Sequence, residues 1–154
     1  MNILLEIWEY ILVFLLGATP WVEIAAVIPL SIIAGLNPIL VGLIAFLGNL
    51  STVYLLIIFF EKFREWRKRK KGEDQPKSKR QARAVGIWNK YGLPGLSLLG
   101  PLLIGSHVAV FIGLLFGAKK QTTLFWMTIS LVLWTLVITI LSYYGIDFLV
   151  QLRG

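Results

Sequence analysis

The residue of this sequence best suited to chemistry is Glu23, because no other side chain between Tyr10 and Phe60 is charged. An ionised carboxylate in the middle of a bilayer is strongly disfavoured unless it is neutralised or wet. We therefore expect Glu23 to be protonated, paired or facing a wet cavity, and each of these states suits a carrier. The alternative is a structural role, in which the carboxylate caps the exposed amides of a helix broken after Pro20.

A second group of candidate residues surrounds His107, the only histidine, whose ring can titrate near neutral pH. Gly100, Pro101 and Gly105 precede it and are expected to break the helix and expose peptide groups. The N-terminus of a half-helix at this point would favour an anionic group. We expect the segment to bind a proton or a headgroup; in the alternative, His107 only bonds to a backbone carbonyl.

Three further residues belong to these candidate sites or lie close to them in the sequence. Pro29 follows Glu23 by six residues and is expected to break the helix that carries the carboxylate. Asn49 lies in a long apolar stretch, where its amide can hydrogen-bond across helices for packing or for substrate binding. Asn37 is expected to shape a turn before Pro38.

Composition predicts an integral membrane protein. The mean hydropathy is +0.78, and only 15% of the residues are charged, against about a quarter in soluble domains. The chain contains no cysteine, so it has no thiolate metal site and no disulfide. It also lacks paired carboxylates, a nucleophile elbow and a phosphate-binding glycine loop. We expect neither an enzyme nor a bound metal or cofactor.

The basic residues are concentrated in one segment, since twelve of the fifteen Lys and Arg lie between Lys62 and Lys90. Short loops rich in Lys and Arg are retained on the cytoplasmic side. The segment is therefore interpreted as a topology determinant of a multi-pass protein in the cytoplasmic membrane. An alternative is binding to anionic lipid headgroups. Nucleic acid is not an expected partner, because no suitable fold or aromatic platform accompanies the charge.

The hydrophobic segments predict one transmembrane domain, residues 1–154, with a first half at 1–60, a basic loop at 61–90 and a second half at 91–154. In each half a segment rich in proline and glycine precedes an uninterrupted apolar helix. The predicted elements are a short N-terminal helix at 3–16, broken units at 17–38 and 91–117, and spanning helices at 39–60 and 122–144.

Charge also predicts how the broken units lie. If the basic loop and Lys119 with Lys120 are both cytoplasmic, residues 91–117 enter and leave the membrane on one face. Residues 17–38 would then form a hairpin of opposite orientation. The fold class expected is an all-α membrane protein with two inverted repeats, each a broken re-entrant hairpin followed by a transmembrane helix. Residues 10–36 could instead form a single kinked crossing.

Several motifs together resemble the bacterial and archaeal family of small multidrug export proteins. They are Glu23 followed by a small apolar run to Ile28-Pro29, Ala34-Gly35-Leu36-Asn37-Pro38, Gly48-Asn49, Lys90-Tyr91-Gly92 and Leu99-Gly100-Pro101-Leu102 with Gly105. The likeness covers about residues 19–141. More distantly the chain resembles the DedA and VTT superfamily, which implies proton-coupled transport or lipid translocation, with undecaprenyl phosphate as a substrate. Many relatives carry an Arg where this chain has Ala25.

These observations predict a membrane transporter, acting as a proton-linked carrier or flippase for an anionic lipid such as undecaprenyl phosphate. The expected partners are protons, membrane lipids, a small-molecule or lipid-phosphate substrate and a second copy of the chain in a homodimer. One alternative is a proton/drug antiporter of the small multidrug export type. The other is a scaffold that transports nothing.

The topology can be tested with single cysteines at Gly72 and Gln121, since the chain has no native cysteine. Both are expected to react only with a thiol reagent applied from the cytoplasmic side. Labelling of the Gln121 position from outside would make residues 91–117 a crossing and contradict the re-entrant hairpin.

Overall fold

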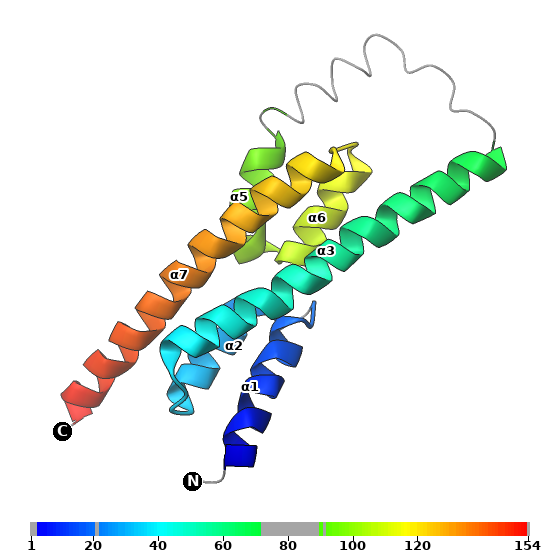
Figure 1. Cartoon of the computed structure of the whole chain (residues 1–154). Helices are drawn as coiled ribbons and strands as arrows, with labels where there is room; N and C mark the ends of the chain where they lie inside the picture. Colours follow the sequence, from blue (N-terminus) through cyan, green and yellow to red (C-terminus); the bar gives the residue numbers. More distant parts are fainter. Residues whose placement is uncertain (1–2, 21, 72–89, 91, 154) are drawn as a thin grey trace. The chain divides into compact units, whose positions relative to one another are not determined.

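The computed structural model describes residues 3–20, 22–71, 90 and 92–153, and this part of the chain is helical with no strand (Figure 1). The prediction of an all-α fold is therefore confirmed for the described residues. The order is two short helices followed by a long one, twice over. The helices are α1 (Ile3–Gly17), α2 (Glu23–Ile33), α3 (Pro38–Lys71), α5 (Leu93–Leu103), α6 (Ser106–Leu115) and α7 (Lys120–Arg153).

The chain forms two compact units. The first consists of Met1–Thr52 and Leu131–Gly154, and the second of Val53–Ser130. The first unit therefore holds α1, α2, the beginning of α3 and the end of α7. The second holds α5, α6 and the remaining parts of α3 and α7.

Within the described residues, two helices are long and apolar enough to cross a membrane, over Pro38–Trp66 in α3 and Lys120–Ile146 in α7. Both spanning helices were predicted, but each extends further than expected. α3 continues past Phe60 to Lys71, so Lys62 and Arg64 lie on a helix and not in a loop. The reason is the composition after residue 60, where Glu, Lys and Arg are good helix formers. The rest of the predicted basic loop, residues 72–89, lies outside the described residues.

The predicted helix breaks at Pro29 and Pro101 are wrong. α2 runs through Pro29 to Ile33, and α5 runs through Pro101 to Leu103. A proline removes one backbone hydrogen bond and bends the helix, but less than two turns follow it in either case. In α2 packing holds the remaining segment, since Ile32 is buried. In α5 the proline itself is buried and only Leu102 and Leu103 of the helix follow it.

The turn before α3 has the shape expected of Asn37. Its side-chain Oδ1 accepts hydrogen bonds from the amides of Ile39 (3.0 Å) and Leu40 (3.3 Å), so Asn37 caps the helix that Pro38 begins. The backbone N–H of Asn37 donates a hydrogen bond to the hydroxyl oxygen of Tyr10 on α1 (3.3 Å). Gly35 supplies the positive φ of 92° that reverses the chain.

Small residues allow the helices of the first unit to approach closely. A Cβ added at Gly17 would lie 2.8 Å from the Ala45 carbonyl oxygen, and one at Gly48 would collide with the carbonyl oxygen of Phe14. α1 thus packs on α3 nearly backbone to backbone. On another side of α3, a Cβ at Gly42 would lie 2.8 Å from Oγ1 of Thr139 on α7.

In the second unit, α5 and α6 form an antiparallel helical hairpin, which Figure 1 shows as two adjacent short helices. Gly100 near the end of α5 faces Ala109, and Leu93 at the start of α5 contacts Gly113. Their backbone reverses at Ile104 and Gly105. The predicted hairpin of residues 91–117 is therefore present as a pair of helices. Its re-entrant position in a membrane stays a prediction.

The packing of α1 on α3 generates a stability prediction. Gly48→Ala places a methyl group against the backbone of Phe14 and should lower the free energy of unfolding by about 1–3 kcal/mol, the usual cost of overpacking. Gly145→Ala is the matched control, since nothing lies within 4 Å of its Cβ position on α7. Unfolding midpoints in detergent measure both, and equal midpoints would contradict the close approach.

Candidate functional site

Glu23 is the first residue of α2 and is 6% exposed. Its backbone has a φ of 49°, the only positive value at a non-glycine residue in the described part of the chain. Such a backbone costs about 1–2 kcal/mol for an L-residue. Ile24, Val27 and Ile28, which follow on α2, are also buried. A carboxylate is thus held in a strained conformation at the start of an apolar helix.

The position of Glu23 at a helix N-terminus has an electrostatic consequence. The free amides of a first turn form the positive end of the helix dipole and stabilise a nearby negative charge. The helix itself begins through backbone bonds, since the amide of Glu23 donates to the Thr19 carbonyl oxygen (3.3 Å). This setting is compatible with both interpretations of Glu23, a proton site and a helix cap.

Asn49 and Pro29 belong to the same unit as Glu23. Asn49 is 0% exposed and follows Gly48, which packs against α1. Pro29 is half-buried within α2 and does not break it. Asn49 therefore lies in the packed part of α3, whereas the effect of Pro29 is confined to the helix that carries Glu23.

The other predicted site residues lie in the second unit, around the α5–α6 turn. Gly105 precedes α6 with φ 91° and ψ 149°, a backbone region that glycine alone adopts readily. His107 is 7% exposed, and its Nδ1 lies 3.2 Å from Oγ of the buried Ser106. A buried hydroxyl and the only histidine are therefore adjacent in the first turn of α6.

Gly100 does not expose its peptide groups as expected. Its carbonyl oxygen accepts hydrogen bonds from the amides of Ile104 (2.9 Å) and Gly105 (2.8 Å). Its Cα lies against Ala109, and Pro101 is buried as well. Both residues end α5 and close the hairpin, because a side chain at residue 100 would push α6 away. A role of either residue in binding stays a prediction.

The predicted residues are divided between the two compact units. Glu23, Pro29 and Asn49 are in one unit, and Gly100, Pro101, Gly105 and His107 are in the other. The expected meeting of both hairpins at one polar centre involves both units and stays a prediction.

A pair of hydroxyls on α7 was not predicted from the sequence. Oγ1 of Thr135 and Oγ1 of Thr139 are buried and have no hydrogen-bond partner among the described residues. With Gly42 of α3 they line a groove of about 420 Å³ in the first unit. Their spacing of four residues was the available signal, because it places both on one helix face.

The family model described as "Putative small multi-drug export protein" matches residues 23–137. The chain belongs to this family. The matched region begins at Glu23 and includes α2, α3, α5 and α6 with most of the apolar part of α7. The resemblance seen in the sequence motifs is thus confirmed. No curated protein and no solved structure matches the chain.

Membership in the small multi-drug export family, together with the two apolar spans, identifies a membrane protein of a transporter kind. The matched region contains every predicted site residue and excludes α1. The elements that carry Glu23 and His107 therefore belong to the part of the chain that defines the family.

The turn at Gly105 generates a second stability prediction. Gly105→Ala should destabilise the protein by about 1–3 kcal/mol, the cost of holding a side chain in this backbone region. Gly95→Ala on α5 is the control, because its Cβ position is open and its φ is ordinary for a helix. Thermal unfolding of both variants in detergent checks this, and an unchanged midpoint for Gly105→Ala would show that the turn relaxes freely.

Proposed function

We propose that this protein is a proton-linked membrane carrier in which Glu23 binds the transported proton. The observation that carries the proposal is the burial of this carboxylate on a left-handed backbone, at the start of an apolar helix. Burial and strain are both unfavourable for folding, and such features persist where function requires them. A helix cap alone could be provided by Ser, Thr, Asn or Asp without that conformation.

The mechanism follows from the two charge states of one carboxyl group. Protonated Glu23 is neutral, so α2 can face an apolar environment. Ionised Glu23 requires water or a cationic partner, and in this state the site opens to an aqueous side. Because the two states favour different surroundings, proton uptake and release bias the carrier between its two orientations.

We assign the α5–α6 hairpin to substrate binding. The first turn of α6 has backbone amides at the positive end of the helix, next to Ser106 and His107, a setting that favours an anionic headgroup. The repeated order of two short helices and one long helix supports a pair of repeats. Its first pair is α1 with α2, in place of the hairpin predicted at 17–38, which holds only one complete helix. In this arrangement a homodimer in the cytoplasmic membrane would complete the path of the substrate across the membrane.

An anionic lipid such as undecaprenyl phosphate is the substrate class we propose. A small drug is the second candidate, and the family description favours it directly. The two differ in charge, because a lipid phosphate suits the start of α6, whereas a cationic drug suits the ionised form of Glu23. A scaffold role would leave Glu23 with no pH-dependent part in function.

Glu23→Gln tests the proposal, since it keeps the shape of the side chain and removes its titration. We expect the variant to fold normally and to lose proton-coupled transport into proteoliposomes, with no pH dependence left. Glu9→Gln is the control, because Glu9 is exposed on α1. It should transport as the parent does.

The same vesicles, assayed with a lipid phosphate and with a cationic dye in parallel, separate the substrate classes. Transport of the lipid alone supports the carrier proposed here, and transport of the dye alone supports a drug antiporter. Equal activity and an unchanged pH profile of Glu23→Gln would remove this carboxylate from the mechanism.

A further inference from the structure

The second unit carries an aromatic groove between α3 and α6, with a volume of about 570 Å³. Its size lies in the range of about 300–1,000 Å³ that is usual for small-molecule sites. The groove is lined by, among others, Phe59, Phe60, Phe63 and Arg64 of α3 and by Phe111 and Leu115 of α6. Phe59 and Phe63 are four residues apart, and so are Phe60 and Arg64. Each pair therefore lies side by side on the face of α3 that lines the groove.

The walls of the groove are apolar and accessible. Phe60 and Phe111 meet edge to face, with ring centroids 5.8 Å apart, and fix the two helices at the base of the groove. Phe59 is 71% exposed and Leu115 is 60% exposed. Contact with a long hydrocarbon chain would cover this surface without any change in the packed rings.

One end of the groove lies near the ends of two candidate membrane spans. Arg64 is close to the end of the α3 span at Trp66, and Lys120 begins the α7 span. An ion pair of 3.1 Å joins Glu61 of α3 to Lys120, so these two span ends are level with each other. Trp66 stacks near Phe63 at 5.9 Å between ring centroids, and tryptophan is enriched at membrane interfaces.

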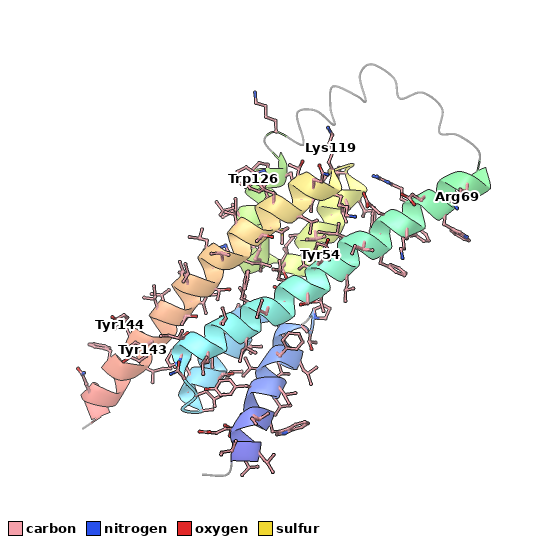
Figure 2. All side chains as sticks on the ribbon, viewed as in Figure 1. Tyr54, Arg69, Lys119, Trp126, Tyr143 and Tyr144 are labelled. Atoms are coloured by element: carbon pink, nitrogen blue, oxygen red, sulfur yellow. The ribbon has the colours of Figure 1, made fainter. Side chains whose placement is uncertain are left out.

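The charge at this end is positive on balance, because the exposed basic residues outnumber the one exposed acid nearby, Glu65. The Glu61 carboxylate is engaged by Lys120, whereas Arg64 is exposed and lines the groove. Lys119 is exposed just before α7, and Arg69 lies near the end of α3 (Figure 2). A guanidinium binds phosphate oxygens in a two-pronged geometry and is a preferred partner for them.

We propose that this groove binds one anionic phospholipid, with an acyl chain along Phe59, Phe63 and Phe111 and the headgroup phosphate at Arg64. The apolar length, the aromatic walls and the guanidinium of Arg64 among the lining residues match an amphiphile that is apolar at one end and anionic at the other. Free phosphate would leave the aromatic groove unused, and a cationic amphiphile would meet Arg64 with like charge. The groove shares α6 with the proposed substrate hairpin but involves neither Glu23 nor His107, so a failure of its test leaves the proton site at Glu23 untouched.

Native mass spectrometry of the purified full chain tests the proposal with phosphatidylglycerol and phosphatidylcholine of identical acyl chains. We expect phosphatidylglycerol to bind about fivefold more tightly, which corresponds to about 1 kcal/mol for one basic residue at a membrane surface. Arg64→Gln should remove this preference. Arg69→Gln is the matched control, because Arg69 is exposed on the same helix but does not line the groove, and it should retain the preference.

A second experiment blocks the apolar part of the groove. Leu115→Trp fills the groove and should weaken both lipids, whereas Leu103→Trp, an exposed position on α5 outside the groove, should weaken neither. A phosphatidylglycerol with a photoactivatable acyl chain should label the peptides that contain Phe59 and Phe111. The proposal is overturned if Arg64→Gln and Arg69→Gln behave alike, if glycerol phosphate displaces the lipid, or if labelling falls on other helices.

Discussion

Where a membrane-spanning chain departs from helical geometry, the peptide groups released from the helix must be bonded again within the protein or by water. The described turns meet this requirement in different ways. The Asn37 side chain bonds the first amides of α3, and the Gly100 carbonyl accepts both amides of the α5–α6 turn. The break before α2 is closed by the bond from Glu23 to Thr19. This last turn is the one that places a carboxylate on a left-handed backbone.

Close helix contacts then hold these turns in position. α1 packs closely on α3, where Gly48 of α3 meets Phe14 and Gly17 of α1 meets Ala45. α5 meets α6 at Gly100. Without a hydrophobic force between helices in lipid, such approaches supply the packing energy. The large apolar side chains that remain exposed on α3 and α7 are suited to contact with lipid. The polar side chains of Asn49, Ser106 and His107 are instead buried inside the units.

Apolar length and the order of breaks were enough to predict the helical class, both long apolar helices and the α5–α6 pair. A turn at Asn37 was also predicted, but not that its side chain caps α3. The helix-breaking effect of the prolines was overestimated. At Pro101 the burial of the ring and the nearby end of α5 outweigh one lost hydrogen bond. The extension of α3 to Lys71 was missed because the charged residues were taken as a loop signal, although their helix propensity is high. No pattern in the sequence encodes the backbone conformation of Glu23, since it results from tertiary packing. The spacing of Thr135 and Thr139 places both on one helix face, but only the packing shows that this face is buried.

The central claim is that Glu23 exchanges a proton while buried in the folded protein. Infrared difference spectroscopy of the protein in lipid, recorded between two pH values, measures this directly through the C=O stretch of a protonated carboxyl group. We expect a carboxylic acid band that changes with pH in the parent protein and is absent from Glu23→Gln. A spectrum with no such band, or with the same band in both proteins, would contradict the assignment of Glu23 as the proton site.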